Sequence, residues 1–224
     1  MVSPMTPAEV EKRLAAEAAA ELVTDGMTVG LGTGSTVHHL LVALGRIRPR
    51  IRCVATSVAT AEEATGLGLT VEEFVGIDRL DLAIDGADQI APDGWIVKGG
   101  GGAHTREKIV AAAADRFVVI ADSSKVVPRL AAPIPLELHR FGLAATVRAL
   151  GPVSLRDAPP SPDGGVIADF LGEVGDPASL AIRLAACPGV VDHGLFPPEL
   201  TATIIVATGD RIETREIGPG SASS

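Results

Sequence analysis

Helix-like and strand-like segments alternate along the first 130 residues, and this alternation limits the possible fold more than any other feature. Short runs rich in Val, Ile and Leu lie between Ala-rich amphipathic stretches. Strands that alternate with helices predict parallel βαβ units, and therefore a Rossmann-like three-layer α/β sheet domain. We expect helices at residues 7–23, 35–44, 57–65 and 103–114, and strands at residues 27–31, 51–55, 70–74, 80–84, 95–98 and 116–121.

The pattern changes near residue 130, where prolines begin to divide the chain into shorter pieces. Further helices are expected at residues 142–150 and 177–186, and strands at residues 153–155, 166–170, 190–195 and 201–207. The β-α-β-β-α-β-like order before the last strand predicts a small α+β domain of the ferredoxin-like kind. We therefore expect a catalytic α/β domain of residues 1–130 with about 201–217, a small domain of residues 131–200, and a disordered tail of residues 218–224.

Composition argues against several classes of partner. The formal net charge is −9 and the pI is about 5.0, and the chain has one Trp, five Phe and no Tyr. An acidic chain with few aromatic side chains is poorly suited to bind nucleic acid or an anionic membrane. Cys53 and Cys187 are too isolated for a disulfide framework or a thiolate metal site. With no apolar run of membrane-spanning length, we expect a cytoplasmic protein.

A run of four glycines, from Gly99 to Gly102, separates an expected strand that ends at Lys98 from an expected helix that opens near Glu107. Glycine runs cannot pack a core, and a chain tolerates them where its backbone approaches a ligand closely. Near a helix N-terminus the dipole favours an ionised carboxylate, which can act as a general base. An ammonium group can stabilise an oxyanion. The segment therefore predicts proton transfer on an anionic substrate.

Three other polar clusters follow expected strands, at the edge where open α/β sheets bind ligands. Residues 30–36 form a Gly-, Ser- and Thr-rich turn before a helix, which suits a phosphate group. Asp85 and Asp88 suit hydrogen bonds to sugar hydroxyls, and no His or third carboxylate is placed beside them to complete a metal site. Lys125 ends the fourth cluster and would bring a second cation.

Each cluster also has an ordinary structural explanation. Residues 30–36 can be a plain strand-to-helix turn, and Asp85 and Asp88 can form a turn or cap a helix. Glu107 can simply complement a helix dipole. Lys125, like Lys98, can be a solvated side chain. The choice between these explanations depends on whether the clusters meet.

In order and spacing, the clusters resemble type A ribose-5-phosphate isomerases. The segments that carry the resemblance are residues 30–36, 85–88, 98–101 with 106–109, 121–125, and 188–191 with 194–196. The resemblance spans about residues 6–217. It implies an aldose–ketose isomerase that interconverts D-ribose 5-phosphate and D-ribulose 5-phosphate through an enediol(ate), in the non-oxidative pentose phosphate pathway. It also implies a reaction that needs no metal and no cofactor, with a small sugar phosphate as the partner.

Carried over by position, the resemblance makes Glu107 the base. The implied catalytic residues are Glu107, Lys98, Asp85 and Asp88. The implied substrate-binding residues are Thr33, Gly34, Ser35, Thr36, Asp85, Gly86, Ala87, Asp88, Lys98, Gly99, Gly100, Gly101 and Lys125. The apolar small domain suggests self-association, as a homodimer or homotetramer.

The chain departs from the family pattern at His104, where an apolar residue is usual, and at residues 161–165, where the usual turn sequence differs. His104 can be a bystander or a modulator of the site. Lys12 is the one residue that we can offer for the basic side chain that often helps to hold the phosphate. Two other classes of function stay open: a related enzyme, such as an amino-sugar-phosphate deaminase or a coenzyme A transferase, and a sugar-phosphate-sensing module without turnover.

Overall fold

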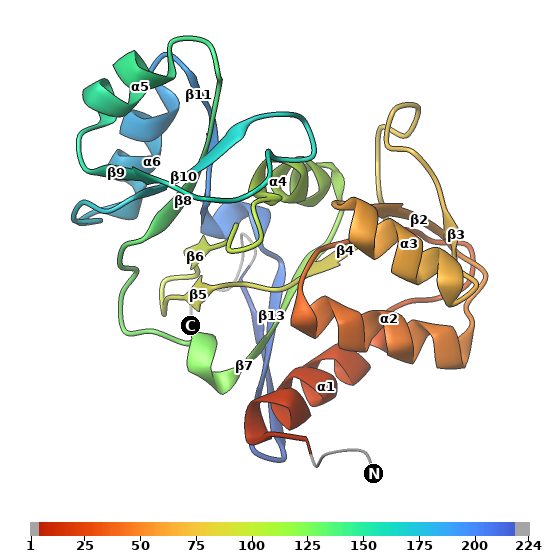
Figure 1. Cartoon of the computed structure of the whole chain (residues 1–224). Coiled ribbons are helices and arrows are strands. Elements are labelled where there is room, and N and C mark those ends of the chain that lie inside the picture. The colour runs from red at the N-terminus through yellow and green to blue at the C-terminus, as the bar shows by residue number, and fades with distance from the viewer. Residues whose placement is uncertain (1–4, 218–224) are drawn as a thin grey trace.

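The large parallel sheet that the alternation predicts is present in the computed structural model, which describes residues 5–217 (Figure 1). Its strand order is β14-β13-β7-β4-β1-β2-β3, and every neighbouring pair is parallel except β13 with β14. The strands are β1 (Thr28–Leu31), β2 (Arg52–Ala55), β3 (Thr70–Val71), β4 (Leu82–Asp85), β7 (Phe117–Asp122), β13 (Thr203–Thr208) and β14 (Arg211–Glu216).

Helices cover both faces of this sheet, which gives the three layers. The helices of the first half are α1 (Pro7–Ala20), α2 (Ser35–Ile47), α3 (Val58–Gly66) and α4 (His104–Ala113). One apolar core joins α1, α2 and α3 to one face, and another joins α4 to the opposite face. Along β7 the side chains alternate between the two cores, with Val118 and Ile120 in the first and Phe117 and Val119 in the second. Such alternation is what a strand buried on both faces requires.

A second, four-stranded sheet carries two helices and forms the unit at the upper left of Figure 1. Its elements are β8 (Ile134–Leu138), α5 (Leu143–Leu150), β9 (Val153–Leu155), β10 (Val166–Phe170), α6 (Pro177–Ala185) and β11 (Val190–His193). The strand order β11-β8-β10-β9 is antiparallel throughout and belongs to the expected β-α-β-β-α-β unit. Helix α4 contacts both β4 of the large sheet and β8 and β11 of the small one.

The alternation of helices and strands wrongly assigned the expected strand at residues 95–98 to the large parallel sheet. It forms β6 (Ile96–Val97), which pairs antiparallel with β5 (Gln89–Ile90) and β12 (Leu195–Phe196) in a separate three-stranded sheet. This pairing could not be predicted from local pattern, because β6 has only two paired residues and its partner β12 lies about a hundred positions away in the chain. Strands β8 and β14 were not expected, and the expected strand at residues 70–74 pairs only at Thr70–Val71.

Two short 3-10 helices, η1 (Ser123–Lys125) and η2 (Pro198–Leu200), complete the described elements. Strand β13 runs parallel to β7, so the chain returns to the large sheet after the small unit. The division into two domains stays a prediction, and residues 218–224 lie outside the described residues. Within residues 5–217, no helix is both long and apolar enough to cross a membrane.

The order of strands places the site. From β1 the chain first builds outward through β2 and β3, and it then returns to add β4, β7 and β13 on the other side of β1. Strands β1 and β4 are therefore neighbours at the point where the strand order reverses. In open α/β sheets the crevice at this point, outside the carboxyl ends of the strands, is the usual ligand site.

Candidate active site

Three buried ionisable side chains meet at this switch point. The Nζ atom of Lys98 lies 2.9 Å from Oδ2 of Asp85 and 3.2 Å from Oε2 of Glu107. None of the three residues is more than 5 % exposed. Asp85 ends β4, Lys98 follows β6 and Glu107 lies in the first turn of α4, so three separate segments supply the cluster. Two carboxylates thus share one ammonium group.

Asp85 is oriented by backbone donors. Its Oδ1 atom accepts hydrogen bonds from the N–H of Thr33 at 3.1 Å and from its neighbour Gly86 at 2.7 Å. The carboxylate lies directly against Gly32, where an added Cβ atom would lie 1.9 Å from the Asp85 Cγ. Only glycine therefore fits at position 32. The close approach ties the turn after β1 to the carboxylate after β4.

Hydrogen bonds hold both the side chain and the backbone of Lys98. Its ammonium donates a hydrogen bond to the carbonyl of Gly86 at 2.6 Å, and its backbone N–H donates to the carbonyl of Gly194 at 2.9 Å. A Cβ atom on Gly194 would lie 2.1 Å from the Lys98 carbonyl oxygen, so the chain between β11 and β12 can pass there only as glycine. The ring centroid of Phe196 lies 5.7 Å from Nζ and covers one side of the ammonium.

Burial controls the charges in this cluster. Removal from water, together with the negative charge of Asp85, raises the pKa of Glu107 from 4.5 to about 8, and Lys98 offsets this only in part. Burial also raises the pKa of Asp85. Burial disfavours the charge on Lys98 as well, but the two carboxylates outweigh it and raise the pKa of the ammonium. Lys98 is therefore a cation at neutral pH, and the Glu107 carboxyl is mostly protonated there.

Glu107 differs from the sequence-based expectation in one respect. It lies in the first turn of α4, as expected, where the helix dipole favours its ionised form. The structure shows that desolvation is the larger effect, because the side chain is almost fully enclosed. A carboxyl with a pKa near neutrality is a stronger base than an ordinary glutamate once it is ionised.

The glycine run lines the open side of the cluster. The N–H of Gly100 donates to Oδ2 of Asp88 at 2.7 Å, which joins the second aspartate to the run. Gly100 and Gly101 are exposed, and an added Cβ atom at Gly101 would lie 3.9 Å from the methyl group of Thr33. The run thus lies beside the turn after β1. Ala87, also expected in the site, is half-buried and packs on the core beneath α4.

The expected phosphate turn leads directly into α2. Gly34 and Ser35 are exposed at the start of this 13-residue helix, and Thr36 is buried in its first turn. The hydroxyl of Thr33 lies 2.8 Å from that of Thr56, a buried residue directly after β2 that the sequence analysis missed. Its position at the end of the neighbouring strand was the available signal. Exposed N–H groups at a helix N-terminus suit an anion.

Two expected cations form no ion pair with the buried cluster. Lys125 lies on η1, directly after β7, and its side chain has no hydrogen bond or ion pair with a residue between 5 and 217. Lys12 pairs with Glu9 at 2.7 Å, and Glu9 in turn lies 2.9 Å from a ring nitrogen of His39. The structure therefore gives Lys12 a partner on its own helix.

His104 is the first residue of α4 and is fully buried beside Gly99. Neither ring nitrogen makes a hydrogen bond of good geometry within residues 5–217, although the backbone of Asp192 lies near the ring. Burial lowers the pKa of the imidazole to about 4, so the ring is neutral and serves as packing behind the glycine run.

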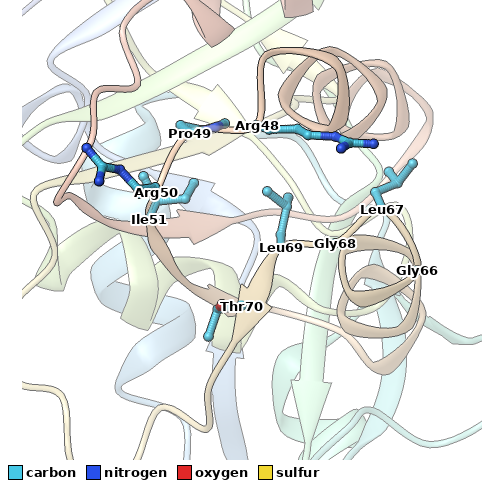
Figure 2. A pocket seen from close by; sticks show the side chains of 9 residues that line it. All are labelled: Arg48, Pro49, Arg50, Ile51, Gly66, Leu67, Gly68, Leu69 and Thr70. Carbon is cyan, nitrogen blue, oxygen red and sulfur yellow. The ribbon is translucent and has the colours of Figure 1, made fainter.

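Among residues 5–217, no three His, Cys, Asp or Glu side chains gather in a way that would hold a metal ion. An open hollow of about 620 Å³ is found elsewhere, between the end of α2 and the turn before β3 (Figure 2). It contains none of the expected site residues, and its two arginines, Arg48 and Arg50, extend to opposite sides. We therefore place the site at the ionisable cluster and the loops around it.

Comparison with known proteins agrees with this geometry. Residues 52–211 match the family model described as ribose 5-phosphate isomerase A (phosphoriboisomerase A). The chain is 47 % identical over 205 residues to the ribose-5-phosphate isomerase A of Rhodopseudomonas palustris (strain BisB18), which covers 83 % of this chain and 88 % of that protein. It is 45 % identical over 219 residues to the ribose-5-phosphate isomerase A of Halobacterium salinarum (strain ATCC 29341 / DSM 671 / R1). This match covers 92 % of this chain and 96 % of that protein.

Solved structures agree as well. The ribose 5-phosphate isomerase A of Neisseria gonorrhoeae superposes with a TM-score of 0.91 at 33 % identity, over 96 % of this chain and all of that one. A D-ribose-5-phosphate isomerase in complex with phospho-erythronic acid superposes with a TM-score of 0.88 at 31 % identity, over 95 % and 100 %. The chain therefore belongs to the ribose 5-phosphate isomerase A family and is an isomerase that interconverts D-ribose 5-phosphate and D-ribulose 5-phosphate.

Proposed function

We propose that Glu107 is the base that carries a proton between C2 and C1 of the open-chain sugar. The single observation that supports this most is the Lys98 ammonium held between Asp85 and Glu107 in a buried cluster. An ionised Glu107 removes the proton from C2 of ribose 5-phosphate and returns it to C1. The enediolate that forms between these two steps carries negative charge on oxygen. Lys98, already cationic and enclosed, stabilises that charge without reorganisation.

The remaining groups hold the substrate around this proton transfer. We place the phosphate at the exposed start of α2, from Thr33 to Thr36, with Lys125 as a second cation. Asp85 and Asp88 accept hydrogen bonds from sugar hydroxyls, and they assist ring opening and the movement of a proton between O1 and O2. The glycine run adds peptide N–H groups on the open side. Each of these roles is supported by the position of the group, at or near the edge of the large sheet where its parallel strands end.

Substitution of the base tests the proposal. We expect Glu107→Gln to lower kcat by about 10²–10⁴-fold, the usual contribution of general-base catalysis. The matched control is Glu62→Gln, which makes the same chemical change at an exposed carboxyl on α3 that has no ion pair or hydrogen bond among the described residues. Activity is measured as ribulose 5-phosphate formed from ribose 5-phosphate. A Glu107→Gln enzyme that stays folded and keeps wild-type kcat would contradict the assignment.

Solvent isotope incorporation tests the enediolate separately. When the reaction runs in D₂O, a proton carried by Glu107 can exchange with solvent before it reaches C1. We expect deuterium at C1 of the ribulose 5-phosphate product, detected by NMR. Transfer of hydrogen from C2 to C1 without any solvent deuterium would instead indicate a hydride shift, in which Glu107 takes no part.

Inhibition by phospho-erythronic acid extends the test to binding. A related isomerase has been solved with this acid, and we expect it to compete with ribose 5-phosphate here. We expect its carboxylate to lie where the enediolate oxygens form, so Lys98→Met should weaken this inhibitor more than it weakens inorganic phosphate. Equal loss for both inhibitors would mean that Lys98 does not face the reacting carbons.

We infer further that the protein acts in the cytoplasm as a homodimer or homotetramer. Two large apolar side chains on the small unit are unusually exposed, Phe141 before α5 at 94 % and Ile182 on α6 at 71 %. Exposed apolar groups of this size are typical of contact surfaces. Light scattering after gel filtration measures the oligomeric state, and a monomer at micromolar concentration would contradict the inference. Cell fractionation tests the location.

A further inference from the structure

Arg156 connects the small sheet to the glycine run. It follows β9, and its Nε and Nη2 atoms donate to the two carboxylate oxygens of Asp169 on β10 at 2.8 and 2.6 Å. The remaining nitrogen, Nη1, donates to the carbonyls of both Gly99 and Gly100 at 2.9 Å each. Every nitrogen of the guanidinium is thus engaged, and the Asp169 fork fixes its plane. Only arginine can supply such a planar set of donors.

This contact sets the direction of two peptide groups. In a trans peptide the carbonyl of one residue and the N–H of the next point in opposite directions. Because Arg156 draws the carbonyls of Gly99 and Gly100 toward the small sheet, the N–H groups of Gly100 and Gly101 must point away from it. The first of these donates to Asp88 at 2.7 Å, as this geometry requires.

The second N–H group, that of Gly101, is available to a ligand. It has no hydrogen-bond partner among residues 5–217, and Gly101 is exposed beside Thr33 at the expected phosphate turn. Four glycines have no side chains that could fix their peptide planes, and they lose more conformational freedom on folding than other residues. Outside groups are therefore needed to hold the run in one orientation. Arg156 contacts two of its carbonyls, and Asp88 accepts one of its N–H groups.

We propose that Arg156, held by Asp169, is a positioning residue for catalysis: it aligns the peptide N–H groups of Gly100 and Gly101, the first to orient Asp88 and the second to bind a substrate oxygen next to the reacting carbons. Arg156 touches no substrate itself. The inference rests on the proposed function of the site, because the aligned N–H groups matter only if the sugar is bound there. It gives the small unit a direct role in the chemistry of the large sheet.

The test compares Arg156→Met with Arg52→Met. Arg52 forms a similar fork with Glu72, at 2.7 and 2.7 Å, but it lies exposed on β2 and does not contact the site. We expect Arg156→Met to lower kcat on the order of 10²-fold, the effect of a small misplacement of aligned groups. It should raise the inhibition constant of phospho-erythronic acid more than that of inorganic phosphate, because the N–H groups at the start of α2 do not depend on Arg156. Arg52→Met should change none of these values.

Two further variants keep the test independent of folding. Arg156→Lys retains the charge but offers a single nitrogen, so it should recover little of the lost kcat. Asp169→Asn retains the size of the side chain but loses one of the two acceptors of the fork. It should therefore lower kcat less than Arg156→Met does. Each comparison is made on protein whose thermal unfolding midpoint is measured alongside.

Three results would overturn the inference: an unchanged kcat in Arg156→Met, equal weakening of both inhibitors, or full recovery of kcat in Arg156→Lys. Glu107→Gln, measured in the same assay, separates this inference from the proposed function. If Glu107→Gln loses activity and Arg156→Met does not, only the role of Arg156 is wrong. If Glu107→Gln keeps wild-type kcat, the proposed base itself is wrong, whatever Arg156→Met does.

Discussion

The raised pKa of Glu107 predicts that Glu107→Gln, while it removes catalysis, makes the folded protein more stable above neutral pH. The wild-type carboxyl keeps its proton in the folded state up to about pH 8, whereas in the unfolded chain it releases the proton near 4.5. Between these values the folded state binds more protons, so the stability of the wild type falls as pH rises. Glutamine resembles the protonated form and does not titrate.

The size of the effect follows from the width of this window. A carboxyl with this shift costs roughly 1.4 kcal/mol of stability for each pH unit between 4.5 and 8, or roughly 5 kcal/mol over the whole window. Asp85 and Glu107 titrate as a pair, so the proton lost near pH 8 belongs to both. With Glu107→Gln, Lys98 keeps Asp85 as a matched partner. The stability gained by the variant should therefore grow by about 3 kcal/mol from pH 5 to pH 8.

Urea unfolding at pH 5, 6, 7 and 8 measures this difference. At pH 8 the gain corresponds to a rise of roughly 10 °C in the unfolding midpoint for a chain of this size. Glu62→Gln, at an exposed carboxyl, should show a difference from wild type that does not change with pH. A Glu107→Gln difference that stays constant or shrinks as pH rises would refute the reasoning, because it would mean that burial does not raise the pKa of this carboxyl.

The same charges and contacts predict four further results. In the wild type, kcat/KM should rise with pH and level off above about pH 8, since the free enzyme needs Glu107 ionised; a profile that is flat from pH 6 to 9 would contradict this. Lys98→Met should lower kcat by at least 10²-fold and destabilise the fold by about 3 kcal/mol, seen in urea midpoints, because it leaves two buried carboxyls without a cation. Gly32→Ala should lower kcat on the order of 10²-fold, since the new methyl group displaces the Asp85 carboxylate; wild-type turnover would mean that Asp85 need not lie there. Treatment with a metal chelator should leave kcat unchanged, and a loss restored by added metal would contradict the proposed mechanism.

The sequence analysis predicted the parts of the site that depend on sheet topology. Asp85 ends one parallel strand, and Thr33 follows another, so both had to reach the same edge of the sheet. The contact between the Thr33 N–H and Asp85 follows from this, because β1 and β4 are neighbours. That the two residues lie at one edge required only parallel strands. That they touch depends on the order of the strands, which the sequence analysis did not predict.

The position of Lys98 could not be predicted in the same way. The residue was expected at the end of a parallel strand, but β6 pairs antiparallel with β12, and the Lys98 backbone is held by Gly194. Arg156 escaped notice for a similar reason, since its partners are carbonyls of glycines 56 and 57 positions away. The local pattern of apolar and polar residues indicates which residues a strand buries. It carries no information on hydrogen-bond partners so distant in the chain.

The pKa of Glu107 shows how a correct location can lead to an incomplete energetic expectation. Its position in the first turn of α4 favours the ionised form by less than about 1 kcal/mol. Enclosure between two layers favours the protonated form by several kcal/mol, and enclosure depends on tertiary packing. A helix N-terminus can be predicted from sequence, whereas the depth of burial of one carboxyl in its first turn cannot.

The buried cluster and the glycine run both make the folded state less stable. Two carboxyls and an ammonium without water destabilise the folded state, and four glycines lose more entropy on folding than other residues. Both features lie where α4 meets the large and small sheets, and the apolar cores on either side supply the stability that they lack. Enclosing the base makes it strong, and leaving the run without side chains lets backbone N–H groups reach the sugar. The small sheet is thus more than a cover, because through Arg156 it fixes the one part of the site that has no side chains to orient it.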